Sequence, residues 1–287
     1  MKMPNTVFEV LQRASSFLSA NGREETAARL LIQNVLQTNY SGLMMRMQEQ
    51  MPNEQIAVLE EMLQMHARGV PVQYIIGVEE FYGREFQVDQ SVLIPRPETE
   101  ELIVGAMERM KKLFGKESSL KLADIGTGSG AIAVTMKLEW PDAAVTATDI
   151  SQAALATAGK NAEQLQATID FRLGDLTEPI AQQKWDVVLS NPPYIAFQEA
   201  AEMSDVVLEH EPHTALFAEE DGLILYRKLA EQLPALMNRP ALIGVEIGYT
   251  QGRAVAGFFQ QYFPNALIEI VKDINGKDRI VFCEISE

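Results

Sequence analysis

The stretch Asp124-Ile125-Gly126-Thr127-Gly128-Ser129-Gly130-Ala131 places three glycines between an apolar run and a helical pattern. Residues 120–125 read as a short buried strand, and residues 131–139 have the period of a helix. Glycines at such a strand-to-helix turn let the backbone approach a ligand closely. In an open parallel sheet, ligands bind beyond the carboxyl ends of the strands. The stretch therefore predicts an α/β fold with a ligand site at this turn.

Apolar strand segments continue to alternate with helical segments along the rest of the chain. This rhythm indicates a mostly parallel sheet covered by helices on both faces. Two late segments separated by Asn275-Gly276 predict a terminal hairpin at the sheet edge. The predicted segments are strands at 144–149, 169–173, 185–190 and 241–247, helices at 151–166 and 220–238, and hairpin strands at 266–271 and 279–285.

The first part of the chain has a different pattern. From Thr6 to about Arg68 apolar residues recur at helical spacing, which predicts a small helical bundle. Residues 80–94 mix aromatic and β-branched residues with turn residues and predict a β-hairpin linker. Acidic residues then open a helix that runs to about Phe114. We therefore divide the chain into a helical domain at 1–75, a hairpin linker at 76–97 and an α/β domain at 98–287.

Charge and composition limit the classes of partner. The chain has 287 residues, with 24 Lys and Arg against 40 Asp and Glu, which gives a net charge of −16. Such a field repels phosphate backbones, so stable nucleic-acid binding is disfavoured. The single cysteine, Cys283, excludes an intramolecular disulfide and is expected to fill the core of a late strand. Neither a signal peptide nor a long apolar run is evident, so we expect a cytoplasmic protein without a membrane anchor.

The glycine stretch and the next strand suggest what the ligand is. Asp149 ends that strand 23 residues after Gly126, where a carboxylate can accept hydrogen bonds from both ribose hydroxyls of an adenosine. The glycine spacing also satisfies a dinucleotide fingerprint, so it does not separate a nicotinamide cofactor from S-adenosylmethionine. Asp124 favours S-adenosylmethionine, because a carboxylate repels a pyrophosphate and attracts an ammonium or a sulfonium. A tight turn that binds nothing is the alternative.

A second motif follows the buried strand at 185–190. Asn191-Pro192-Pro193-Tyr194 reaches the same carboxyl edge as the glycine stretch. The carboxamide of Asn191 and the carbonyl of Pro192 can present two acceptors side by side to a planar NH2 group. Tyr194 offers a flat face on which a planar amide or base can stack. A rigid turn that leaves the strand is the alternative.

Together the two motifs resemble amino-methylating S-adenosylmethionine-dependent methyltransferases, and the rest of the chain is similar to one subgroup, the release factor glutamine methyltransferases. That family methylates the side-chain amide nitrogen (N5) of the glutamine in the Gly-Gly-Gln loop of class 1 peptide chain release factors. The resemblance covers nearly the whole chain. Besides the two motifs it rests on 73–77, 81–83, 93–100, 209–212, 215–216, 221–223, 226–227, 246–248, 272–273 and 276–279.

The resemblance implies a Rossmann-like, seven-stranded class I methyltransferase domain preceded by a helical substrate-recognition domain. It implies S-adenosylmethionine as cofactor, S-adenosylhomocysteine as product and a release factor as partner. Separately, we expect no metal, and we expect a monomer although the sequence does not determine the oligomeric state. Asn191, Pro192 and Tyr194 would be catalytic, and Asn191 to Tyr194, including Pro193, would hold the substrate glutamine. The cofactor contacts would come from Gly126, Thr127, Gly128, Ser129, Gly130, Asp149 and Asn191.

Several alternatives stay open at this stage. The protein could instead be an adenine-N6 methyltransferase, because the exocyclic amine of adenine would present the same planar NH2 group to Asn191. The acidic net charge of the protein opposes binding to DNA or RNA. A binding module for translation factors without turnover is the other class. Leu176 stands where the family often has an aromatic residue near the adenine, so an adenine contact there is in doubt. The sequence leaves the roles of Arg96, Glu98 and Glu246 undecided, and the spacing of His66, His210 and His213 does not predict a metal site.

Overall fold

A computed structural model of the chain describes residues 5–115, 119–202 and 204–286. The chain divides into two compact units. The first comprises residues 1–78 together with 204–210, and the second comprises residues 79–203 together with 211–287. Each unit has a hydrophobic core of its own.

The first unit is the helical bundle that the apolar spacing predicts. Its core is built from buried aliphatic side chains such as Leu18, Leu31 and Leu59. Two hydrogen bonds of 3.0 Å from Arg23 to Asp205 join the later segment to the bundle. The helices are α1 (Val7–Ala20), α2 (Thr26–Val35), α3 (Tyr40–Met45), α4 (Asn53–Ala67), α5 (Val72–Ile76) and α9 (Asp205–His210).

The predicted linker hairpin is present as β1 (Val78–Phe81) and β2 (Arg84–Gln87). Tyr82 and Gly83 form the turn with φ angles of 53° and 68°, which is the geometry of a two-residue hairpin turn. Asn161 clamps the end of this hairpin to the glycine stretch. Its Nδ2 donates to the carbonyl oxygens of Gln87 at 3.0 Å and Ser129 at 2.8 Å, and its Oδ1 accepts from the Gln87 N–H.

The second unit is built on the predicted mostly parallel sheet, so the α/β fold class is confirmed. Within the described residues seven strands pair in the order β10-β11-β9-β6-β3-β4-β5. Strand β11 runs antiparallel to both of its neighbours, and β10 and β11 form the predicted hairpin at one edge. The strands are β3 (Lys121–Ile125), β4 (Ala144–Asp149), β5 (Asp170–Leu173), β6 (Trp185–Ser190), β9 (Met237–Glu246), β10 (Leu267–Lys272) and β11 (Asp278–Ile285).

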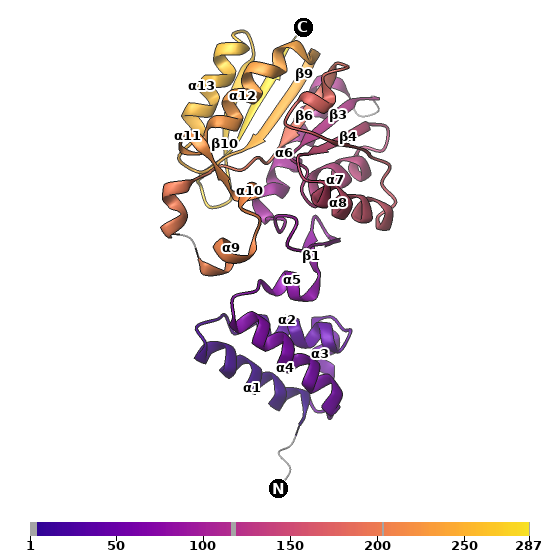
Figure 1. The fold of residues 1–287 in the computed structure, drawn as a ribbon. Helices are drawn as coiled ribbons and strands as arrows, with labels where there is room; N and C mark the ends of the chain where they lie inside the picture. The colour runs from indigo at the N-terminus through magenta and orange to yellow at the C-terminus, as the bar shows by residue number, and fades with distance from the viewer. Residues whose placement is uncertain (1–4, 116–118, 203, 287) are drawn as a thin grey trace. The chain divides into compact units, whose positions relative to one another are not determined.

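Helices cover both faces of this sheet, as Figure 1 shows for α7 and α8 on one side and α12 and α13 on the other. Successive residues of the central strand β6 face opposite layers, with Val187 and Leu189 in one core and Val188 in the other. Cys283 is buried in β11, in agreement with its predicted role. The helices are α6 (Pro97–Phe114), α7 (Ala131–Glu139), α8 (Gln152–Gln164), α12 (Ile224–Gln232) and α13 (Gly252–Tyr262).

The helix predicted at 220–238 is wrong at both ends. Glu220 and Asp221 have φ angles of 54° and belong to a separate turn, so the regular helix begins at Ile224. Pro234 lies in a short 3-10 helix after Gln232, since proline lacks the N–H that an α-helix needs. Strand β9 then begins at Met237, which pairs with Trp185 of β6.

Shorter elements connect the sheet to its helices. They are η1 (Glu178–Ile180), β7 (Ile195–Ala196), η2 (Phe197–Glu202), α10 (His213–Leu216), β8 (Phe217–Ala218), α11 (Glu219–Gly222) and η3 (Leu233–Ala235). Strands β7 and β8 pair in parallel, with Ile195 opposite Phe217 and Ala196 opposite Ala218. Among the described residues no helix combines the length and the apolar character needed to cross a bilayer.

Packing at Gly244 yields a test of the fold. A Cβ at Gly244 would lie 2.7 Å from Phe282 Cε1 and 3.0 Å from Leu189 Cδ2. Because both neighbours are buried, Gly244→Ala should lower the free energy of unfolding by about 1–3 kcal/mol. Chemical denaturation followed by tryptophan fluorescence measures this, since both tryptophans, Trp140 and Trp185, belong to the α/β unit.

The matched control is Gly159→Ala in α8, where a Cβ meets nothing within 4 Å. It should raise stability by roughly 0.5–1 kcal/mol, because alanine loses less backbone entropy than glycine in a helix. Equal stability of Gly244→Ala and the wild-type protein would contradict the packing described for β9.

Candidate active site

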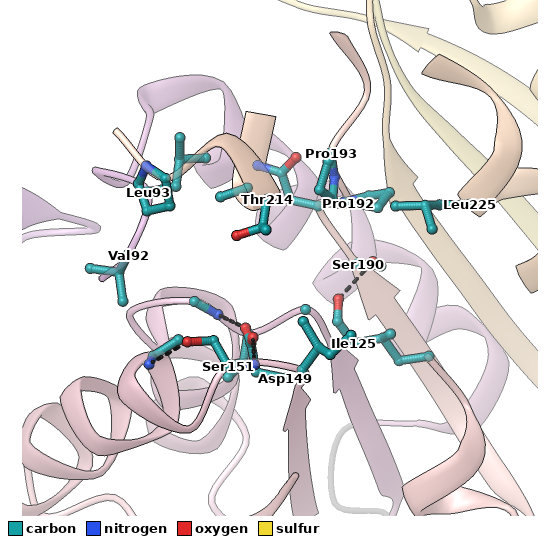
Figure 2. Close-up of a pocket in the computed structure, with 18 of the residues that line it drawn as sticks. Val92, Leu93, Ile125, Asp149, Ser151, Ser190, Pro192, Pro193, Thr214 and Leu225 are labelled. Atoms are coloured by element: carbon teal, nitrogen blue, oxygen red, sulfur yellow. Dashed lines mark hydrogen bonds between the residues drawn. The ribbon is translucent and has the colours of Figure 1, made fainter. Parts of the chain in front are cut away.

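A cavity of about 500 Å³ opens at the carboxyl ends of β3, β4 and β6. Figure 2 shows Asp149 and Ser151 on one side of it, with Pro192, Pro193 and Thr214 across from them. The glycine stretch and the Asn191 segment both line this cavity. The structure therefore brings the two motifs together, although they lie more than 60 residues apart in the chain.

The backbone geometry explains why positions 126, 128 and 130 of the loop are glycines. Gly126, Gly128 and Gly130 have φ angles of 73°, 56° and 83°, which side chains with a Cβ rarely adopt. A Cβ at Gly126 or Gly128 would meet nothing within 4 Å, so their backbone faces open space. At Gly130 a Cβ would lie 3.1 Å from the Ala158 side chain, so this glycine allows α8 to pack closely. Thr127 and Ser129, between them, are buried and also line the cavity.

The carboxylate of Asp149 is held firmly at the end of β4. Its Oδ2 accepts from the Gly128 N–H at 2.9 Å, and its Oδ1 accepts from the Ser151 N–H at 2.8 Å. Each oxygen keeps a free lone pair, because a carboxylate can accept about four hydrogen bonds. Asp149 can therefore order the glycine loop and still accept hydroxyl groups from a ligand.

Asp124 lies fully buried directly behind the loop. Its Oδ2 accepts from Thr127 Oγ1 at 2.6 Å and from the Ala133 N–H at 3.1 Å. Its Oδ1 is buried without a hydrogen-bond partner. Burial raises the pKa of this carboxyl to about 7, from an ordinary value of 3.8. A buried oxygen without a partner is costly, so a ligand that brings positive charge to this loop would be favoured.

The segment after β6 presents Asn191, Pro192 and Pro193 to the cavity. Tyr194 does not line it: its ring lies against Gly248, and burial raises the pKa of its phenol to about 12. The Tyr194 carbonyl accepts from Gln251 Nε2 at 2.8 Å. A Cβ at Gly222 would lie 2.0 Å from that same carbonyl oxygen, so only glycine fits there. These contacts fix the backbone of the motif.

Two buried side chains behind Asn191 extend the site. Asn191 Nδ2 donates to Thr99 Oγ1 at 3.1 Å, and Thr99 Oγ1 donates to Glu246 Oε2 at 2.6 Å. Burial raises the pKa of Glu246 to about 7. The sequence left the role of Glu246 open and overlooked Thr99. The sequence signals for Glu246 are its position at the carboxyl end of a buried strand and its place in the stretch 246–248 that contributes to the resemblance.

The remaining candidate residues have different surroundings. Arg96 lines the cavity and donates to the buried Glu211 carboxylate at 2.5 Å. Leu176 also lines the cavity, close to the carboxyl end of β5. Glu98 lies near enough to Glu246 to raise its pKa by charge repulsion. Within residues 5–115, 119–202 and 204–286 no three His, Cys, Asp or Glu side chains are grouped to hold a metal ion.

Two family models match the chain. The model "PrmC N-terminal domain" matches residues 9–77, and the model "Methyltransferase small domain" matches residues 105–214. The first match covers most of the helical unit. The second covers the glycine loop and the segment from Asn191 to Tyr194.

Full-length relatives and a solved structure agree with these matches. A release factor glutamine methyltransferase of Bacillus anthracis is 50% identical over 281 residues, which is 97% of this chain and 99% of that protein. The protein of the same name from Bacillus subtilis strain 168 is 46% identical over 278 residues, which is 96% of each chain. The structure of a T. thermophilus 16S rRNA N2 G1207 methyltransferase with AdoMet and guanosine has 15% identity, covers 72% of this chain and 49% of that chain, and superposes with a TM-score of 0.50. This last likeness concerns the fold alone.

The buried Asp124 predicts a pH dependence of stability in the protein without ligands. Its pKa of about 7 in the folded state lies above its ordinary value of 3.8, so the folded protein holds the proton more tightly. The contribution of this group to stability is complete below pH 4 and is lost as the pH rises through 7. Glu246, whose pKa is also about 7, adds a similar slope.

Asp124→Asn should therefore remove roughly half of the loss in melting temperature between pH 5.5 and 8.5. Thermal unfolding followed by tryptophan fluorescence measures this loss in the wild-type protein and the variant. An unchanged slope in Asp124→Asn would show that Asp124 does not hold a proton in this range.

Proposed function

The chain belongs to the release factor glutamine methyltransferases, and from this membership we propose the reaction that it catalyses. It transfers a methyl group from S-adenosylmethionine to the side-chain amide nitrogen (N5) of the glutamine in the Gly-Gly-Gln motif of class 1 peptide chain release factors. The observation that carries this proposal is the shared cavity. Asn191, Pro192 and the glycine loop all line this cavity, and Figure 2 shows Pro192 across it from Asp149.

The residues of the loop fit S-adenosylmethionine. This cofactor carries an ammonium, a sulfonium and a ribose but no phosphate, and when bound it supplies an electrophilic methyl group. The buried Asp124 supplies negative charge behind the loop, and its Oδ1 has no other partner. Asp149 can accept the ribose hydroxyls, and Gly126 and Gly128 leave open space for the ligand. The cavity volume of about 500 Å³ is within the usual range for cofactor sites.

Asn191 and Pro192 hold the substrate amide and help its nitrogen to react. An amide nitrogen is a weak nucleophile, because its lone pair is delocalised into the carbonyl. Asn191 Oδ1 and the Pro192 carbonyl accept the two N–H bonds of the NH2 group and so fix its plane. The same two dipoles offset the positive charge that grows on the nitrogen during methylation. The nitrogen then releases one proton to water, so no strong base is required.

Tyr194 lies outside the cavity lining and contributes to the site through its backbone. Its ring lies against Gly248, and its carbonyl is held by Gln251. In this arrangement Tyr194 supports the backbone that presents the Pro192 carbonyl. Stacking of its ring on the substrate glutamine, which we predicted from the flat face of the side chain, would require the ring to turn toward the cavity.

The charge and the helical domain point to the protein partner. A net charge of −16 favours a basic protein surface, and a release factor acts on ribosomal RNA. The helical domain at 1–75 carries the family match at 9–77 and is assigned to recognition of the release factor beyond its Gly-Gly-Gln loop. The same charge disfavours DNA or RNA as the methylated substrate.

Transfer of labelled methyl from S-adenosylmethionine to a purified class 1 release factor tests the substrate. We expect label on the wild-type factor and none on its Gln→Ala variant in the Gly-Gly-Gln motif, since the glutamine nitrogen is the acceptor. A duplex DNA and an adenine-containing RNA serve as controls. Label on either nucleic acid instead of the factor would contradict the proposal and favour an adenine-N6 methyltransferase. Bound cofactor without any transfer would favour a binding module.

Asn191→Ala tests the role of the carboxamide. Loss of one acceptor at the reacting nitrogen should lower kcat by roughly 100-fold or more. Binding of S-adenosylmethionine, measured by calorimetry, should stay within about threefold of the wild-type value. Asn238→Ala is the matched control, since Asn238 contacts Asp186 at the opposite end of the sheet. Loss of cofactor binding in a folded Asn191→Ala variant would contradict the assignment.

A further inference from the structure

Three residues from separate elements form a chain of hydrogen bonds behind the cavity. Asn191 follows β6, Thr99 lies in the first turn of α6, and Glu246 ends β9. The links are 3.1 Å from Asn191 Nδ2 to Thr99 Oγ1 and 2.6 Å from Thr99 Oγ1 to Glu246 Oε2. Thr99 is 4% exposed and Glu246 is 1% exposed, so water does not compete for these bonds.

The direction of this chain follows from the chemistry of its last member. An ionised carboxylate can only accept hydrogen bonds, and a hydroxyl has one proton to donate. The Thr99 hydroxyl must therefore donate its hydrogen bond to Glu246, and it accepts a hydrogen bond from Asn191. Asn191 can donate that bond only from its NH2 group. Its carboxamide oxygen is then left for the cavity.

We infer that Glu246, directly and through Thr99, sets which polar atom Asn191 presents to the methyl acceptor, and that both Glu246 and Thr99 are positioning residues. The inference rests on the proposed function, because it takes the acceptor to be an amide NH2. With the carboxamide oxygen facing the cavity, the site accepts an N–H donor. It disfavours a carboxylate such as the side chain of glutamate, whose oxygens would face another acceptor.

With an uncharged side chain at position 246, the orientation of the Asn191 carboxamide is no longer fixed. A protonated carboxyl or a glutamine amide can donate to Thr99 Oγ1 as well as accept from it. Thr99 is then free to donate to the carboxamide oxygen of Asn191, which turns the NH2 group toward the cavity. Two NH2 groups would then meet, and the amide nitrogen of the substrate would lose an acceptor.

The charge state of Glu246 is set by the groups that face it. Burial raises its pKa to about 7 and the charge of Glu98 raises it further, whereas hydrogen bonding to Thr99 and Asn191 and the charge of Arg279 lower it. The phenols of Tyr194 and Tyr226 also face Glu246, and burial raises the pKa of both, so they stay neutral. The backbone carbonyl of Glu246 accepts from the Tyr226 hydroxyl at 2.7 Å, which holds this residue in place. The carboxylate form, and with it the orientation of Asn191, is therefore gained as the pH rises through about 7.

The test measures methyl transfer to the release factor at saturating S-adenosylmethionine, so that protonation of Asp124 in the cofactor loop does not limit the rate. Thr99→Val should lower kcat by about 10-fold or more, with cofactor affinity within about threefold. Thr99→Ser keeps the hydroxyl and should restore kcat to within about threefold. Thr135→Val is the matched control, because Thr135 is buried in α7 and its hydroxyl has no partner.

The pH dependence of kcat in Glu246→Gln separates a positioning role from a purely structural one, because a structural role would leave this pH dependence unchanged. In the wild-type protein kcat should rise between pH 6 and 8.5, and in Glu246→Gln it should be lower and flat over the same range. Thr99→Val with wild-type kcat would overturn the inference. So would a Glu246→Gln variant that keeps the pH dependence of the wild-type protein.

A second measurement separates this inference from the proposed function. This measurement is NMR spectroscopy of protein labelled with 15N at asparagine. The side-chain NH2 signal of Asn191 is assigned as the signal that disappears in Asn191→Ala. It should titrate with a midpoint near 7 in the wild-type protein and should not titrate in Glu246→Gln. A signal that does not titrate in the wild-type protein overturns the inference, whatever substrate is methylated. Absence of transfer to the release factor overturns only the proposed function.

Discussion

The site depends on the register of three parallel strands. Ser190 of β6 pairs with Ile125 of β3 on one side and with Val245 of β9 on the other. The Ser190 hydroxyl also donates to the Ile125 carbonyl at 2.7 Å, which locks the ends of β6 and β3 together. The strands therefore end at nearly one level, where Gly126 follows β3, Asn191 follows β6 and Glu246 is the last residue of β9. A slip in register would separate the glycine loop from the carboxamide.

Near these strand ends the protein buries two carboxyl groups, those of Asp124 and Glu246. Burial of a carboxyl group costs free energy unless the group is hydrogen-bonded. Each accepts a hydrogen bond from a threonine: Asp124 from Thr127 and Glu246 from Thr99. Asp124 lies behind the glycine loop and Glu246 lies behind Asn191. One acid therefore serves the cofactor side of the proposed reaction and the other serves the side of the methyl acceptor. The pKa of each is raised to about 7 by burial.

Local patterns in the sequence predicted much of this arrangement, and distant contacts explain what they missed. The bounds of β4 and β6 agree with their apolar runs, because each run is short and flanked by turn or polar residues. The glycine loop and Asn191 were identified because their residue types limit the backbone or the chemistry. The link between Thr99 and Glu246 spans 147 positions, and no spacing in the sequence signals it. The ring of Tyr194 lies away from the cavity because Gly248 leaves room for it beside the sheet, a feature that only the tertiary structure reveals.

In the proposed complex Asn191 presents its oxygen to the glutamine amide. A crystal structure of the protein with S-adenosylhomocysteine and a class 1 release factor would test this arrangement. We expect the glutamine amide nitrogen within about 3.2 Å of both Asn191 Oδ1 and the Pro192 carbonyl oxygen, with Asn191 Nδ2 still hydrogen-bonded to Thr99. A glutamine amide held by other groups, or a bond from Thr99 to the Asn191 oxygen, would contradict it.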